Sequence, residues 1–225
     1  RRVGWIGLAS GAMFATMITF FLLALTLTTV ANTQAIVCLA PFTGALAGWV
    51  LLRERLPLRT VIAMACALAG ISLMFMESLG TGRMLGNLVA LFVPLAYGVN
   101  VALLRKSHAQ ADMVIAVLIG SFLSALVTLP LAWPFQASAH DLTLLAFMGV
   151  VQLAVGCILL IRATPHLTAA EISLIGLLES LLAPLWVWIG VGERPSDIAL
   201  VGGLIVIGSL VLNEVFALRR KVVIA

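Results

Sequence analysis

The sequence predicts an all-α, polytopic membrane protein, on the evidence of its composition, its long apolar segments and an internal repeat. Of the 225 residues, 63% are hydrophobic and only 10% are charged, whereas soluble domains average about 25% charged residues. Backbone polar groups in lipid must be satisfied within a helix or a closed barrel, and the alternating polar and apolar positions of barrel strands are absent from this sequence. A helical bundle is therefore favoured.

Eight apolar segments are each about long enough to cross ~30 Å of hydrocarbon as a helix. They cover residues 4–25, 30–52, 58–76, 84–104, 112–133, 142–161, 168–190 and 198–218. Basic residues stand at the ends of most of them, as at Arg53, Arg83, Arg105, Arg162 and Arg219. Such residues at the ends of helices report topology, so the basic overall charge does not imply a nucleic-acid partner.

Sorting the loops alternately to two sides divides the Lys and Arg residues eleven to two. One side receives Arg1, Arg2, Arg53, Arg55, Arg59, Arg105, Lys106, Arg162, Arg219, Arg220 and Lys221, and the other receives Arg83 and Arg194. Positive residues accumulate on the cytoplasmic side of membrane proteins. We therefore expect an integral protein of the bacterial inner membrane, with both ends of this chain in the cytoplasm.

Reporter fusions test this topology. Fusions after Lys221 and within residues 105–112 should report cytoplasm, and a fusion at Ser138 should report the outside, because of the asymmetry of Lys and Arg. A cytoplasmic signal at Ser138 would contradict the count of eight spans.

Two long segments and the turn between them occur twice. Thr29, Ala31, Ile36, Leu39, Leu46, Trp49, Glu54 and Arg55 recur 139 residues later as Thr168, Ala170, Ile175, Leu178, Leu185, Trp188, Glu193 and Arg194; after a slip of one residue, Pro57 and Gly70 recur as Pro195 and Gly208. The long period indicates duplication of a multi-helix unit. Since five crossings separate the copies, the second copy is inverted, as in many secondary transporters.

The two copies are unequal, with three spans in residues 1–79 and five in residues 80–225. We therefore interpret residues 1–79 as the remainder of one five-helix repeat and residues 80–225 as a second, inverted one. By this interpretation eight helices of a ten-helix fold are present, and we expect two further helices before Arg1.

The repeated segments resemble a known family. The stretch from Pro41 to Leu56, followed by a helix with Ala69 and Gly70, resembles the fourth and fifth helices of EamA-like members of the drug/metabolite transporter superfamily. Glu179, the Glu193-Arg194 pair and the helix with Gly202, Gly203 and Gly208 resemble the ninth and tenth helices. One departure is that Ser180 follows Glu179, where the family often has proline, and Pro184 comes one turn later.

The resemblance implies a ten-helix carrier of two inverted halves that moves small organic metabolites, such as amino acids or related compounds, usually outward. Its partners would be a small-molecule substrate and the lipid bilayer; a homo-oligomer is left open. The alternative is a membrane scaffold or subunit that has the same fold and does not transport.

Glu179 is the first candidate for the substrate or coupling pathway. It stands near the middle of an apolar segment, where insertion of an acidic side chain costs roughly 2.5 to 3.5 kcal/mol, so it needs a partner, a cavity or a proton. A protonated carboxyl that bonds a neighbouring helix is the structural alternative.

A second group of candidates lies in residues 84–104. Asn87, Tyr97 and Asn100 share a broad helical face with Pro94, and we expect this face to line the pathway, with ordinary interhelical hydrogen bonding as the alternative. Gln152 is a weaker candidate of the same kind, as are Asn32 and Gln34.

The Glu-Arg pairs, Glu54 with Arg55 and Glu193 with Arg194, precede prolines that start the next helices, and we interpret them as structural turns more than as gates. The sequence has no arrangement of catalytic residues, metal ligands or phosphate-binding glycines. We therefore expect no enzymatic activity, no metal and no cofactor.

Overall fold

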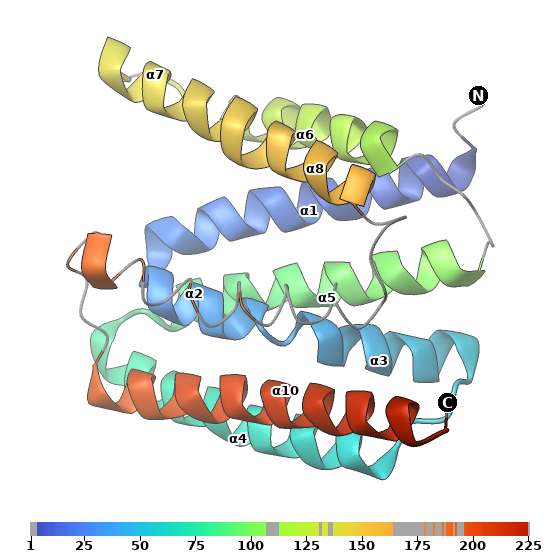
Figure 1. Cartoon of the computed structure of the whole chain (residues 1–225). Coiled ribbons are helices and arrows are strands. Elements are labelled where there is room, and N and C mark those ends of the chain that lie inside the picture. The colour runs from blue at the N-terminus through green and yellow to red at the C-terminus, as the bar shows by residue number, and fades with distance from the viewer. Residues whose placement is uncertain are drawn as a thin grey trace.

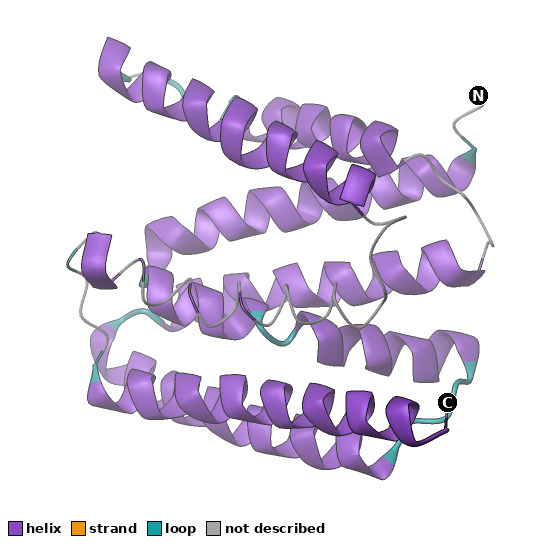
Figure 2. Ribbon diagram, viewed as in Figure 1, coloured by secondary structure: helices purple, strands orange, loops and turns teal. Residues whose placement is uncertain are grey.

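The protein is helical throughout most of the chain that the structure describes (Figures 1 and 2). The computed structural model describes residues 4–106, 113–130, 132–134, 137–163 and 196–224, and in addition residues 178, 182, 186, 188–190 and 192. The helices are α1 (Trp5–Leu27), α2 (Val30–Val37), α3 (Ala40–Leu52), α4 (Leu58–Thr81), α5 (Met84–Lys106), α6 (Met113–Thr128), α7 (Ala139–Phe147), the π-helix η1 (Met148–Val155), α8 (Gly156–Ala163) and α10 (Asp197–Ile224).

Five stretches within the described residues are long and apolar enough to cross a membrane. They are Trp5–Leu27, Val30–Leu52, Leu58–Met76, Met84–Leu104 and Asp197–Phe216, and they coincide with five of the eight predicted segments. The segment predicted at 112–133 contains the shorter helix α6, and the one at 142–161 lies within the consecutive helices α7, η1 and α8. The segment predicted at 168–190 lies outside the described residues, apart from single positions.

The second predicted span differs from the expected continuous helix, because it is interrupted between α2 and α3. Thr29 caps α2 by accepting a hydrogen bond from the Asn32 amide at 3.2 Å, and the helix ends at Cys38. Pro41 then stands at the start of α3. Since proline has no amide proton and its ring clashes with the preceding turn, it is tolerated at a helix start but not in a helix interior. The interruption follows from Pro41.

Helix α7 begins with a capping box. The Ser138 hydroxyl accepts from the Asp141 amide, and the Asp141 carboxylate accepts from the Ser138 amide and hydroxyl. These hydrogen bonds lower the pKa of Asp141. The stabilisation by this cap is therefore present above the ordinary carboxyl pKa and is lost as the pH falls below it.

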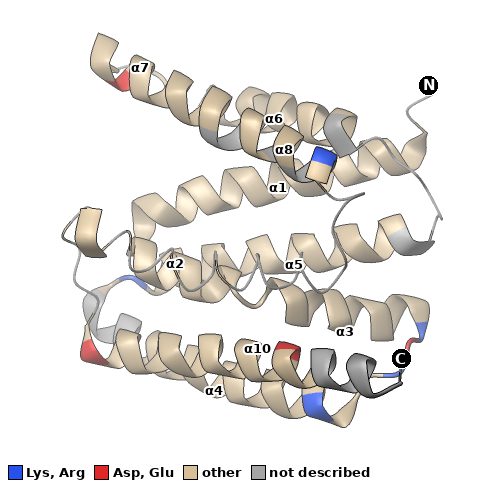
Figure 3. Cartoon of the chain, in the orientation of Figure 1, with Lys and Arg blue, Asp and Glu red and all other residues tan. Residues whose placement is uncertain are grey.

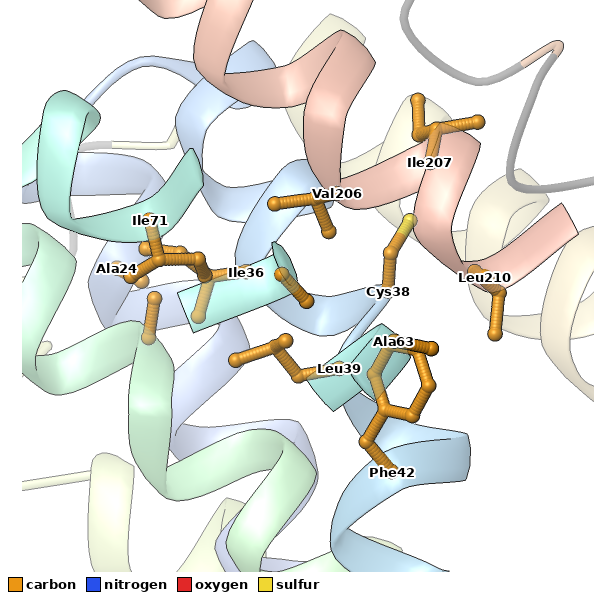
Figure 4. Close-up of a cluster of buried hydrophobic side chains, with 12 residues drawn as sticks. Ala24, Ile36, Cys38, Leu39, Phe42, Ala63, Ile71, Val206, Ile207 and Leu210 are labelled. Atoms are coloured by element: carbon orange, nitrogen blue, oxygen red, sulfur yellow. The ribbon is translucent and has the colours of Figure 1, made fainter. Parts of the chain in front are cut away.

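Helix α5 is at the centre of the bundle. It packs against α1, α2, α3 and α4; α1 packs in addition against α6, and α4 against α10. Buried side chains of α2, α3, α4 and α10 meet in an apolar core, which Figure 4 shows around Ile36, Phe42, Ile71 and Val206. The described side chains of α7 are all exposed.

Helices α4 and α10, which carry the repeated glycine motif, are antiparallel and closely packed. At one end of the pair, the Thr60 hydroxyl lies 3.0 Å from Asn213 Oδ1. Further along, a Cβ on Gly70 would lie 2.6 Å from the Gly202 carbonyl oxygen, and a Cβ on Gly202 would lie 2.6 Å from that of Gly70. Two glycines thus let the helix backbones touch, as small residues do in membrane bundles.

Most charged residues of the described chain lie near helix ends (Figure 3). The end of α3 and the start of α4 lie on the side of both chain termini, and the end of α4 and the start of α10 lie on the opposite side (Figure 1). Arg53 and Arg59 therefore belong to the first side, and Arg83 and Asp197 to the second. This distribution is what a bilayer requires, since charges are disfavoured in its hydrocarbon core.

Candidate functional site

Helix α5 carries the three described side chains that the sequence predicts for the pathway, but it does not place them together. Asn87 and Asn100 are buried, with 0% and 3% of their surface exposed, whereas Tyr97 is 40% exposed. Pro94 is also buried. Burial therefore differs along the face expected in residues 84–104: Asn87, Pro94 and Asn100 are enclosed by neighbouring helices, and Tyr97 is partly exposed. The role of this face in a pathway stays a prediction.

Asn87 is the centre of a buried group of polar side chains, which we call the amide cluster: Thr28, Asn32 and Asn87. The Thr28 hydroxyl donates to Asn87 Oδ1 at 2.7 Å, and Asn32 Nδ2 donates to the same oxygen at 3.5 Å. Asn87 Nδ2 and Asn32 Oδ1 are buried and have no hydrogen-bond partner among the described residues. An unsatisfied buried polar group carries a free-energy penalty of about 1–3 kcal/mol. The cluster thus joins α1, α2 and α5 through two hydrogen bonds to Asn87 Oδ1.

Close backbone contact accompanies the amide cluster. A Cβ on Gly86 would lie 2.6 Å from the carbonyl carbon of Leu27 and 2.7 Å from Cβ of Thr28. The end of α1 therefore rests directly on the first turn of α5.

A second contact joins α3 to the middle of α5, and we call it the central contact: Thr43, Pro94 and Gly98. The Thr43 hydroxyl donates to the Pro94 carbonyl oxygen and also to that of Ala40. A Cβ on Gly98 would lie 2.5 Å from the Thr43 carbonyl oxygen. Pro94 removes one backbone hydrogen bond from the interior of α5. The first turn of α3, just after the break between α2 and α3, therefore contacts α5 at the residue where its backbone hydrogen bonding is incomplete.

Tyr97 and Asn100 lie on α5 beyond Pro94. Cε1 of Tyr97 lies 3.7 Å from the position of a Cβ on Gly44, so the ring packs over the first half of α3. Asn100 Oδ1 is buried without a hydrogen-bond partner among the described residues. Asn100 thus keeps hydrogen-bonding capacity on the same stretch of α5 as the Tyr97 ring.

The structure does not describe the side chains of the other two predicted pathway residues, Gln152 and Glu179. Gln152 belongs to η1, a π-helix, and π-helical turns are frequent at functional sites; its side chain lies outside the described part of the structure. Glu179 lies outside the described residues, as do Glu193 and Arg194.

The turn after α3 has a defined geometry. Arg53 ends the helix in the left-handed conformation, with φ of 56°, and the Glu54 amide donates to the Gly48 carbonyl at 3.2 Å. Glu54 Oε2 lies 2.7 Å from the position of a Cβ on Gly48. Arg55 is exposed. The Glu54 carboxylate is thus folded back over α3, a geometry that suits a structural turn.

The sequence analysis missed Thr28, Thr43, Gly86 and Gly98. A usable signal exists, because Gly86, Ala90, Pro94 and Gly98 recur at every fourth position of α5. Such a stripe of small residues and proline indicates a face where other helices approach closely. Among the described residues, no group of three or more His, Cys, Asp or Glu side chains could hold a metal ion.

Comparison with known proteins assigns the family. The model of the EamA-like transporter family matches residues 1–76 and 84–214, which is nearly the whole chain. Neither the curated proteins nor the solved structures that were compared give a match. The protein is integral to the membrane, and it is a transporter and not an enzyme. The chain belongs to the EamA-like transporter family.

Proposed function

We propose that the protein is a secondary carrier that exports small organic metabolites, such as amino acids or related compounds, by alternating access between two inverted repeats. Its place would be the bacterial inner membrane, with both ends of this chain cytoplasmic. Residues 1–79 and 80–225 would belong to the two repeats. The family match supports transport, and the antiparallel contact of α4 with α10, which carry the repeated motif, is consistent with an inverted pair.

The observation that carries the proposal is the break between α2 and α3, a two-residue turn at Cys38 and Leu39 whose backbone stays in the right-handed helical region, in a span packed along α5. In many secondary transporters, discontinuous helices form the substrate site near the middle of the membrane. Here the interruption at Cys38 and Leu39 is near the middle of the span Val30–Leu52, and Pro94 is near the middle of α5. We propose that substrate binds beside the central contact, with Tyr97 and Asn100 as polar ligands and Gln152 and Glu179 as further pathway residues.

The amide cluster would close one end of this pathway. It joins the end of α1 to the start of α5, on the side of Arg83 that the charge distribution assigns to the exterior. Alternating access requires contacts that form in one state and break in the other. The cluster is held by two side-chain hydrogen bonds, and two of its amide atoms lack partners among the described residues, so separating these helices would remove few satisfied hydrogen bonds.

Thr28→Val tests the cluster, since it replaces the hydroxyl by a methyl group of similar size. Interhelical hydrogen bonds in membranes contribute about 0.6 kcal/mol on average and up to about 1.7 kcal/mol, so we expect a loss of stability in this range and an altered flux. The measurements are thermal unfolding and flux in liposomes. The matched control is Thr26→Val, because the Thr26 hydroxyl bonds only the Leu23 carbonyl of its own helix. If Thr28→Val and Thr26→Val had the same stability and the same flux, the amide cluster would not close the pathway.

The proposed function itself is tested with the purified full-length protein in liposomes loaded with a panel of amino acids and related metabolites. We expect movement of at least one compound down its gradient, and faster exchange when the same compound is present on both sides. Inactivity over the whole panel, by protein that remains folded and inserted, would favour the non-transporting scaffold.

A further inference from the structure

Basic residues are concentrated where α4 begins and α10 ends. The turn before α4 and its first turn carry Arg53, Arg55 and Arg59, and the last turns of α10 carry Arg219, Arg220 and Lys221. The same stretches contain two acidic residues, Glu54 and Glu214. The antiparallel packing brings the two stretches to one end of the bundle, where the Arg59 guanidinium contacts the Phe216 carbonyl oxygen of α10. We call this end the basic junction.

Arg59 connects the start of α4 to the end of α10 at the basic junction. One guanidinium nitrogen, Nη1, donates to the Phe216 carbonyl oxygen on α10 at 2.8 Å. Arg59 is in the first turn of α4, which contains no acidic residue. Since the N-terminal end of a helix has a positive partial charge, a cation there is unfavourable unless an anion is near. An anion at the surface of the junction, in addition to the Glu54 carboxylate of the preceding turn, would therefore be favourable.

Exposed apolar side chains adjoin the basic junction on both helices. Leu58 and Ile62 of α4 are 74% and 56% exposed, and Leu212 and Phe216 of α10 are 58% and 53% exposed. In a bilayer this surface contacts acyl chains. A ligand that combines an anionic phosphate with acyl chains therefore matches the site better than a free phosphate ion does.

We propose that the basic junction binds an anionic phospholipid, with its phosphate against Arg59 and Arg55 and its acyl chains along the exposed apolar face of α4 and α10. Polybasic segments next to the cytoplasmic ends of membrane helices attract anionic headgroups. This binding is separate from transport and does not depend on the proposed substrate site. The lipid would hold the start of α4 against the end of α10.

The test measures lipid retained by the purified protein, with native mass spectrometry and thermal unfolding in detergent. The probes are phosphatidylglycerol, phosphatidylcholine and inorganic phosphate at equal phosphate concentration. We expect phosphatidylglycerol to be retained and to raise the melting temperature, and the other two to have little effect. Each arginine near an anionic surface contributes about 1 kcal/mol, or about fivefold in affinity. Arg55→Gln and Arg59→Gln should therefore each reduce phosphatidylglycerol retention about fivefold.

Two comparisons keep the result interpretable. Arg83→Gln removes an exposed arginine at the opposite end of the bundle and should retain the lipid like the unmodified protein. Arg59→Gln also breaks the bond to Phe216, but Arg55→Gln leaves that bond in place, so a loss of retention in Arg55→Gln reports binding and not misfolding. Equal retention of phosphatidylcholine, equal stabilisation by inorganic phosphate, or unchanged retention in Arg55→Gln would each overturn the proposal.

Discussion

Replacing Gly202 by alanine is expected to destabilise the protein more than other single additions of a methyl group to α10. The new Cβ would lie 2.6 Å from the Gly70 carbonyl oxygen and 2.6 Å from Cγ of Met74. The methionine side chain can move, but the backbone carbonyl can move only with α4. Overpacking of this kind costs typically about 1–3 kcal/mol and occasionally more. A lower melting temperature and a smaller yield of monodisperse protein in detergent would measure it.

The matched control is Gly208→Ala in the same helix. Among the described residues, and apart from the backbone of α10 itself, no atom lies within 4 Å of a Cβ built at Gly208, so we expect room for this methyl group, and alanine also favours helix over glycine. We expect Gly208→Ala to be neutral or slightly stabilising. If both variants unfolded at the same temperature, the close contact of α4 and α10 would be wrong.

Glu179→Gln is expected to abolish proton-dependent flux while the protein remains folded. Its basis is the sequence, since Glu179 lies outside the described residues. Glutamine keeps the size and a hydrogen-bonding pattern but cannot titrate, so it separates a role in coupling from a role in packing. The measurement is flux in liposomes at several pH values, together with thermal unfolding.

Glu54→Gln is the control for Glu179→Gln, because Glu54 is a carboxylate in an exposed turn. It should leave the flux and its pH dependence unchanged if the turn is structural. Wild-type flux of Glu179→Gln at every pH would assign Glu179 to packing instead. Loss of flux in both variants would contradict the interpretation of the Glu-Arg turns.

The helical class and most helix positions could be predicted from the sequence, because a bilayer imposes a minimum length on every span. The predicted segments 4–25, 58–76 and 84–104 differ from α1, α4 and α5 mainly at their ends. Helix ends depend on local caps that hydropathy does not register, as Gly82 shows by ending α4 with a positive φ of 71°.

The interruption at Pro41 was present in the sequence but was not predicted, because the apolar composition of residues 30–52 outweighed one proline. The arrangement of the candidate site was less predictable still. Helical spacing placed Asn87 and Tyr97 on a common face, but it cannot say which neighbours approach that face. Only the packing shows that Thr28 and Asn32 enclose Asn87, while Tyr97 stays partly exposed.

Two glycines of α5, one on each side of Pro94, touch the backbone of neighbouring helices. Gly86 rests on the end of α1, and Gly98 rests on Thr43 of α3. Without an amide proton at Pro94, the resistance of α5 to bending is lowest between these points. A bend there lets the first half of α5 tilt with α1 while the second half stays with α3. Bending of α5 at Pro94 would thus separate helices at one end of the bundle while the contact of α5 with α3 is kept.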